Sequence, residues 1–270
     1  MALIEDGSKT TVIMVEEPEN HLTHNNLNLL VAHIKSRCKD KQAIVSTHSS
    51  FVANKLGLNN IIVLGPDAKN FKLSDLREET FDFFQKLSGY DTLRLILSGI
   101  VVLVEGPSDE LIFQKAYMER CKKLPIENGV DVISVGTSFL RFLEIAEKIS
   151  TKVIVITDND GNIEALKKKY NRYLNVDETP VKKIHIFFDQ ETHRVNDQKY
   201  NWNTLEPNLV RANDIEIMQK ILGREDIRDD LVGYMIKNKT ESALKIFNSN
   251  LKIEYPNYIT LAVEEALKNE

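Results

Sequence analysis

Two acidic segments supply the clearest chemistry in this chain. Glu105 follows a run of valines and leucines and is itself followed by a Gly-Pro turn and Asp109; Asp158 and Asp160 follow a second apolar run. In parallel α/β sheets, ligands bind at the carboxyl ends of the strands, so neighbouring strands would bring these acids into one crevice. Carboxylate oxygens suit Mg²⁺ or Mn²⁺, which combine one or two protein carboxylates with water and phosphate oxygens. The acids therefore predict a metal-dependent phosphate chemistry.

Simpler roles exist for each acid taken alone. A strand-end acid more often begins a turn or caps a helix, and Asp109 could merely complement a helix dipole. The Asp-Asn-Asp-Gly run at 158–161 is not an EF-hand, because its glycine comes fourth and Lys169 stands at position twelve. Residues 106–110 are not a serine-hydrolase elbow, since Glu110 replaces the second glycine. Because two apolar strands both end in acids, a shared site is favoured over separate structural roles.

The elements that must position these acids alternate between β-branched strands and amphipathic helices. This alternation is typical of an α/β fold with a mainly parallel sheet. Helices are expected near 109–121, 139–149 and 162–172, and from 213 to the end of the chain with a C-cap at Gly223. The expected strands of this block are 100–105, 131–135, 152–157 and 183–188. An earlier block has expected strands at 11–15, 42–46 and 60–64 and a helix at 23–38.

Composition excludes several classes of protein. The 270 residues carry 35 Lys and Arg against 40 Asp and Glu, a net charge of −5, which argues against coating nucleic acid by bulk charge. Two cysteines, Cys38 and Cys121, cannot build a disulfide scaffold or a thiolate zinc cluster. The longest apolar runs fall far short of the ~20 residues of a membrane helix, and no signal peptide opens the chain. We expect a cytoplasmic protein that does not engage a membrane.

The paired acidic motifs resemble the Toprim domain of topoisomerases, primases and related nucleases. That family has a strand-end glutamate followed by glycine and then a strand-end Asp-x-Asp, matched here by Glu105-Gly106 and Asp158-Asn159-Asp160. The resemblance covers roughly residues 98–190. It implies a Toprim sheet and metal-dependent phosphoryl transfer on nucleic acid.

The earlier block resembles half of an ABC-type ATPase. A strand ending in Glu16 and Glu17, then a strand ending in His48, look like a Walker B motif and a switch histidine. In that family the first acid steadies Mg²⁺, the second polarises the attacking water and the histidine senses the γ-phosphate. Glu16 departs from the usual aspartate, and His48 alone would more often be a turn residue. No Gly-x-x-x-x-Gly-Lys-Ser/Thr loop occurs, so this chain is not expected to bind ATP by itself.

An ABC-type ATPase followed by a Toprim domain resembles the OLD (overcoming lysogenization defect) family of nucleases, which includes the large subunit of the Gabija anti-phage system. We therefore expect this chain to be the C-terminal part of a longer protein, shortened either naturally or by engineering. Residues 1–75 are expected to be the end of the ATPase, 76–97 a helical connector, and 98–270 the Toprim domain with a helical extension.

The family resemblance implies further site residues. Glu206, in Trp-Asn-Thr-Leu-Glu-Pro, fits an acidic motif and becomes a candidate metal ligand. Lys239 fits a lysine motif, with Lys237 and Lys245 as fallbacks; it would offset transition-state charge, or act as a base if its pKa were depressed. The metal ligands are then expected to be Glu105, Asp109, Asp158, Asp160 and Glu206 around one or, as we expect, two Mg²⁺ or Mn²⁺ ions.

The function expected from these residues is hydrolysis of DNA phosphodiesters by a nickase or endonuclease, with a role in phage defence. Basic side chains at 167–169, 172 and 182–183 would grip the duplex, although a solvated helix face is the slightly favoured reading of the lysine run. ATP would act only in the full-length protein, expected to be a homo-oligomer with a helicase-like or other partner subunit. A topoisomerase or primase module, and a non-catalytic recombination-type binding module, are the alternatives.

Overall fold

The computed structural model describes residues 12–38, 41–64, 70–86, 90–149, 151–174, 183–193 and 200–268. The chain divides into two compact units, residues 1–97 and 98–270. We describe each unit by itself.

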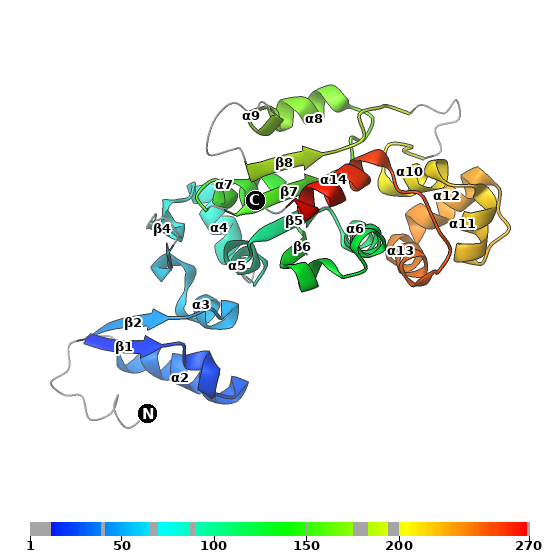
Figure 1. Ribbon diagram of the computed structural model, residues 1–270. Coiled ribbons are helices and arrows are strands. Elements are labelled where there is room, and N and C mark those ends of the chain that lie inside the picture. The colour runs from blue at the N-terminus through cyan, green and yellow to red at the C-terminus, as the bar shows by residue number, and fades with distance from the viewer. Residues whose placement is uncertain are drawn as a thin grey trace. The chain divides into compact units, whose positions relative to one another are not determined.

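The first unit contains a short parallel sheet and a crossover helix. Strands β1 (Val12–Glu16) and β2 (Gln42–Ser46) pair in parallel, and α2 (His24–Arg37) connects them (Figure 1). Leu27 and Val31 of α2 pack with Val52 of α3 (Ser50–Leu56) in a small buried cluster. The outward face of the sheet leaves Met14 77% exposed.

The third strand expected in this unit is present but belongs to a separate sheet. It forms β3 (Ile62–Leu64), which pairs antiparallel with β4 (Asn70–Lys72) in a two-stranded sheet. An apolar run of this length predicts a strand without indicating its partner. Two helices follow, α4 (Glu78–Lys86) and α5 (Tyr90–Leu97).

The second unit is built on a four-stranded parallel sheet, as expected. Its strands are β5 (Ile100–Val104), β6 (Val130–Ser134), β7 (Lys152–Ile156) and β8 (Ile184–Phe187), in the order β6-β5-β7-β8. All five residues of β7 are buried, so both faces of the sheet centre are covered. Helices α6 (Pro107–Cys121) and α14 (Asn257–Leu267) contact these strands and one another, and α7 (Phe139–Ala146) packs against β7 (Figure 1).

The helical extension begins earlier than expected. Helices α8 (Ile163–Lys169) and α9 (Asn171–Leu174) precede β8, and α10 (Leu205–Ala212) starts eight residues before the expected position at 213. It is followed by α11 (Ile215–Leu222), α12 (Arg228–Lys237) and α13 (Lys239–Asn248). Gly223 caps α11 in the left-handed conformation with φ 69°, as predicted. Helices α10, α11, α12 and α13 share one core with α6 and the sheet, so packing fixes their positions relative to the strand ends.

A buried lysine fixes α14 to the sheet. The Nζ of Lys152, the first residue of β7, lies 2.8 Å from Glu265 Oε1 and donates to the backbone oxygens of Glu265 (2.8 Å) and Lys268 (3.2 Å). Burial alone would raise the pKa of the Glu265 carboxyl, but the bonds from Lys152 and Lys268 outweigh it and lower that pKa. The Lys152 side chain therefore caps the last turn of α14 and compensates the charge of Glu265.

Replacing this lysine is expected to destabilise the second unit strongly. Lys152→Met leaves the Glu265 charge and the helix-end carbonyls without their buried donor, a loss of about 3–5 kcal/mol. Lys268→Met removes an exposed, solvent-screened partner of the same carboxylate and should destabilise the unit far less. Urea unfolding of both variants measures the difference, and equal losses would contradict the anchoring role of Lys152.

Candidate functional site

The sheet register places the first acid of the site. Leu103 of β5 pairs with Val155 of β7, so continuing two residues along both strands sets Glu105 beside Thr157. The Thr157 hydroxyl donates to Glu105 Oε1 at 2.8 Å, and the backbone N–H of Asp158 lies 3.3 Å from the same oxygen. Both contacts use Oε1, so Oε2 can face a ligand. Thr157 was not anticipated, although it stands directly before the Asp-x-Asp motif.

Asp109 caps a helix and also lies among other acids of the site. It lies in the first turn of α6, and its Oδ2 accepts the backbone N–H of Gly106 at 3.0 Å, so it does cap the helix. Burial raises the pKa of Asp109 to about 7, with further contributions from the charges of Glu105 and Glu206. Capping alone would not require other acids nearby, so its position also suits a ligand site.

The Asp-x-Asp turn is held by asparagines. Asp160 (φ 49°) and Gly161 (φ 78°) both adopt the left-handed conformation, which Asp tolerates and Gly accepts freely. Asn159 is 2% exposed; its Oδ1 accepts from Gly161 N at 2.8 Å, and its Nδ2 donates to the backbone oxygens of Asp189 (2.7 Å) and Glu191 (2.8 Å). The middle residue of the motif thereby fixes the turn against the loop that follows β8.

A second asparagine pair supports the same turn. Asn201 Nδ2 donates to Asp160 Oδ1 at 3.1 Å, and Asn203 binds Asn201 while exchanging two hydrogen bonds with the backbone of His193. A Cβ on Gly161 would lie 3.1 Å from Asn203 Nδ2, so a glycine suits this close approach. The Asn201–Asp160 bond joins residues 41 positions apart, and the sequence carries no signal for it.

Glu206 and Lys239 meet at the other side of the site. Glu206, in the first turn of α10, is 2% exposed, and its Oε2 lies 3.4 Å from Lys239 Nζ. Its Oε1 is buried without a hydrogen-bond partner among the described residues. A buried carboxylate oxygen without a partner is costly. A cation bound in the site would give Glu206 Oε1 a partner.

Lys239 occupies an unfavourable position for its own helix. It is the first residue of α13, where a cation opposes the helix dipole. Burial alone would lower its pKa, but the charges of Glu206, Asp158 and Asp109 outweigh burial and raise it. The ammonium therefore stays protonated, which favours charge compensation over the role of a base. Of the fallback lysines, Lys245 instead pairs with Glu241 at 3.1 Å, and Lys237 is exposed at the end of α12.

The acids repel one another electrostatically. Burial raises the pKa of Asp158 well above its ordinary value, and the charges of Asp109, Glu105, Glu206 and Asp160 raise it further. Among the described residues, no three His, Cys, Asp or Glu side chains already form a closed metal-ligand set. Mg²⁺ does not require one, because it retains water and typically binds one or two carboxylates plus substrate phosphate. The oxygen-only donors fit Mg²⁺ or Mn²⁺.

This electrostatic strain predicts a pH dependence of stability. A carboxyl whose pKa is higher in the folded chain stabilises fully below its unfolded pKa, and that contribution is lost as pH rises through the folded pKa. For Asp109 the window runs from 3.8 to about 7. In EDTA, the thermal midpoint should therefore fall as pH rises from about 4 to about 7. Asp109→Asn should flatten the decline, and an equally steep decline in that variant would rule out this source.

In the first unit, the three ATPase-like residues lie at the carboxyl ends of β1 and β2. Glu16 ends β1 opposite Ser46, and His48 Nε2 lies 3.5 Å from Glu17 Oε1. Glu19 holds this arrangement: its Oε1 accepts the Thr47 hydroxyl (2.7 Å) and the backbone N–H groups of His48 (2.8 Å) and Ser49 (3.0 Å). Sequence reasoning missed Glu19, although it follows the paired acids by two residues.

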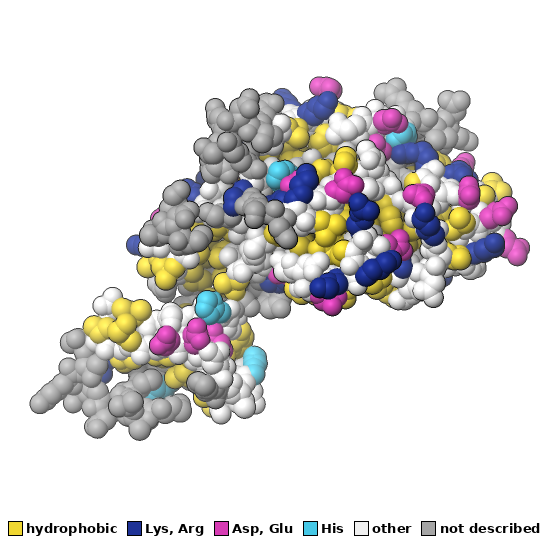
Figure 2. Space-filling model, viewed as in Figure 1, with side chains coloured by type: hydrophobic (Ala, Val, Ile, Leu, Met, Phe, Trp, Pro, Cys, Tyr) yellow, Lys and Arg dark blue, Asp and Glu magenta, His cyan; other side chains and the backbone are white. Residues whose placement is uncertain are grey.

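Two of the basic residues suggested for DNA binding, Lys169 and Arg172, have local partners. Arg172 bonds Glu147 at 2.8 Å, and Lys169 lies over the rings of Phe139 and Tyr170. Residue 182 lies outside the described residues. On the face seen in Figure 2, basic and acidic side chains of the second unit are interspersed. These contacts agree with the interpretation of the lysine run as a solvated helix face.

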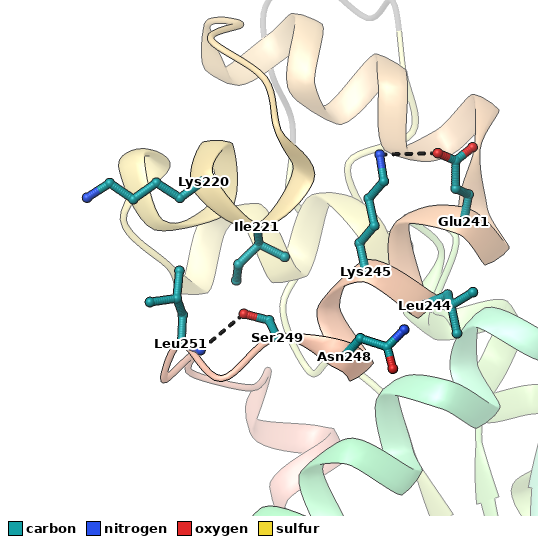
Figure 3. Close-up of a pocket in the computed structure, with 8 residues that line it drawn as sticks. All are labelled: Lys220, Ile221, Glu241, Leu244, Lys245, Asn248, Ser249 and Leu251. Atoms are coloured by element: carbon teal, nitrogen blue, oxygen red, sulfur yellow. Dashed lines mark hydrogen bonds and ion pairs between the residues drawn. The ribbon is translucent and has the colours of Figure 1, made fainter.

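A separate pocket lies in the helical extension. It is an open hollow of about 450 Å³ between α11, α13 and residues 249–251 (Figure 3). Lys245 and Glu241 pair at its rim, and Leu251 N donates to Ser249 Oγ at 3.1 Å. None of the acids of the Toprim-like site lines it.

Comparison with known proteins agrees with the geometry. Residues 96–160 match the family described as the overcoming lysogenization defect protein-like TOPRIM domain. The chain is 25% identical over 194 residues to endonuclease GajA of Bacillus cereus (strain HuB5-5), an alignment that covers 60% of this chain and 28% of GajA.

The chain also resembles solved structures of the C-terminal region of the Xanthomonas campestris pv. campestris OLD protein. One, phased with platinum, is 20% identical, covers 64% of this chain and 94% of that chain, and has a TM-score of 0.42. Another, phased with mercury, is 18% identical and covers 63% and 94%, with a TM-score of 0.44. Among the described residues, no helix is long and apolar enough to span a membrane.

Proposed function

From an OLD-like Toprim domain at residues 96–160, we propose that this chain is the nuclease part of an OLD-family protein and hydrolyses DNA phosphodiesters with divalent metal ions. The observation that carries the proposal is the partly buried acid cluster, in which Asp109 and Asp158 have raised pKa values and Glu206 has an oxygen without a partner among the described residues. The likeness to endonuclease GajA supports the same class of activity.

Each residue of the cluster has a role in this chemistry. Glu105, Asp109, Asp158, Asp160 and Glu206 would hold Mg²⁺ or Mn²⁺. When bound, such ions would supply positive charge to the attacking water and the leaving oxygen. Thr157 orients Glu105, and the asparagines orient the Asp158–Asp160 turn. Lys239, kept protonated by its acidic neighbours, offsets the charge that develops on the scissile phosphate.

The first unit extends the proposal to regulation. Glu16, Glu17 and His48 would face nucleotide in the longer protein, where ATP binding would need a phosphate loop that this sequence lacks. We propose that such a protein acts in the cytoplasm in phage defence, as a homo-oligomer with a helicase-like or other partner subunit. The close approach of Glu17 to His48 supports the nucleotide assignment.

A supercoiled-plasmid assay tests the proposed function. We expect nicked or linear DNA with Mg²⁺ or Mn²⁺, none with EDTA, and loss of cleavage in Glu105→Gln. Glu216→Gln, an exposed acid of α11, serves as the matched control and should cleave normally. Metal-independent cleavage, or equal cleavage by Glu105→Gln, would contradict the proposal. DNA binding without cleavage would favour a non-catalytic binding module, and relaxation without nicking would favour a topoisomerase-type module.

A further inference from the structure

An arginine and a histidine lie beside the Asp158–Asp160 turn, at the carboxyl end of the neighbouring strand. Asp189 follows β8 by two residues, and its Oδ2 accepts from Arg211 Nη2 at 3.0 Å and lies 3.1 Å from His193 Nε2. One carboxylate therefore holds a guanidinium and an imidazole side by side. The proposed cleavage mechanism does not use either group.

The position of this pair is fixed relative to the acid cluster. The backbone oxygen of Asp189 accepts from Asn159 Nδ2, and Asn159 is the residue between Asp158 and Asp160. Strands β7 and β8 are direct neighbours, and adjacent strands lie about 4.8 Å apart. Arg211 and His193 are therefore near the edge of the sheet where the substrate would bind.

The Arg211 guanidinium is only partly used by the protein. Its side chain is 36% exposed, and within the described part of the chain its hydrogen bonds, to Asp189 and to Asn208 Oδ1, all leave from Nη2. The planar guanidinium has five N–H donors and binds phosphate through two at once. The Nε and Nη1 donors can face a ligand while Asp189 and Asn208 keep the group in one orientation, which lowers the entropic cost of binding.

A polyanionic substrate needs such a group here. The acid cluster repels phosphate, and Lys239 is the cation that contacts it within the described residues. Resting on the proposed function, we propose that Arg211, with His193 beside it, binds a backbone phosphate of the DNA strand next to the phosphodiester that is cleaved. This assigns a second anion site to the Toprim unit, separate from the acidic residues that hold metal.

The salt dependence of DNA binding tests this site. A short labelled duplex is titrated with the chain by fluorescence anisotropy in Ca²⁺ at several KCl concentrations, and gels verify that the duplex stays intact. The logarithm of the association constant falls linearly with log[salt], and removing one phosphate contact should reduce the magnitude of this slope by about one. Arg211→Gln should do so and weaken binding about tenfold. Arg211→Lys should keep the slope and lose part of the affinity, because an ammonium lacks the planar fork.

A matched arginine provides the control. Arg224 also bonds an aspartate, Asp226, and its side chain is 38% exposed, close to that of Arg211. Arg224→Gln should change neither the affinity nor the slope. If Arg211 has a purely structural role, Arg211→Gln should have a lower thermal midpoint but the same salt slope as the wild-type chain.

The outcomes separate this inference from the proposed function. If the chain cleaves plasmid in a Glu105-dependent manner but Arg211→Gln keeps the wild-type slope, the inference is wrong and the nuclease proposal stands. If Arg211→Gln reduces the slope but no cleavage occurs, the phosphate site stands without the nuclease. A wild-type chain that does not bind duplex DNA at low salt would overturn the inference as well.

Discussion

Asp158→Asn is expected to abolish cleavage and, at the same time, to stabilise the metal-free chain. The variant loses one carboxylate of the proposed metal site while keeping nearly the same shape. We expect the cleavage rate to fall by at least about 10³-fold, since both the attacking water and the leaving oxygen depend on charge held there. A plasmid assay in Mg²⁺ measures this loss.

The stability gain follows from the electrostatics of the site. In EDTA at about pH 8, the partly buried Asp158 lies among four other acids that raise its pKa, so an uncharged amide of nearly the same shape relieves this unfavourable environment. A gain of about 1 kcal/mol would raise the thermal midpoint of a unit of this size by about 2–4 °C. Such an opposition of activity and stability is typical of residues retained for function.

Asp214→Asn is the matched control for this pair of effects. Asp214 is exposed just before α11, so its amide variant should cleave normally and unfold at the wild-type temperature. Loss of cleavage in Asp158→Asn together with a lower midpoint in EDTA would indicate that the variant simply folds badly. Retained cleavage would exclude Asp158 from the reaction.

The acids could be predicted from sequence because their positions follow from local rules. Glu105 and Asp158 each end a run of buried β-branched residues, and parallel strands with short connections bring such ends together. Glu206 and Lys239 required the family resemblance, because each opens a helix whose packing no local pattern specifies. Their contact at 3.4 Å depends on how α10 and α13 pack in the common core.

The supporting residues could not be predicted in the same way. Asn159 looks like a turn residue in the sequence, but its side chain bridges to residues 189 and 191. Asp189 looks like one more strand-end acid, but it binds Arg211 and His193 instead of joining the acid cluster. Such contacts depend on the partner that the fold provides, and periodicity carries no information about it.

The contrast between Asp158 and Asp189 shows how neighbouring strand ends acquire different chemistry. Both acids follow parallel strands at the same edge of the sheet. Asp158 has acidic neighbours, so it has a high affinity for protons or cations, whereas Asp189 already pairs with the Arg211 guanidinium and contacts the His193 ring. Asn159 bonds the backbone of Asp189 and lies next to Asp158, and therefore sets the spacing between the proposed metal site and the proposed phosphate site.

Lys239→Met is expected to slow cleavage while leaving metal binding intact. The ammonium lies 3.4 Å from Glu206 and is kept protonated by three acids, so its contribution is a fixed positive charge near the scissile phosphate. Loss of one such group from a preorganised site costs about 10²–10³-fold in kcat. Because Lys239 also competes electrostatically with bound cations, the Mg²⁺ concentration for half-maximal activity should stay the same or fall.

Two further variants test whether charge is the property that matters. Lys239→Arg keeps the charge and should recover part of the rate, and Lys237→Met removes an exposed lysine two residues earlier and should cleave normally. Since its pKa is raised, Lys239 should add no ionisation to the rate between about pH 6 and about pH 9. A pH–rate limb that disappears in Lys239→Met would instead assign proton transfer to this lysine and contradict the role of a permanent charge.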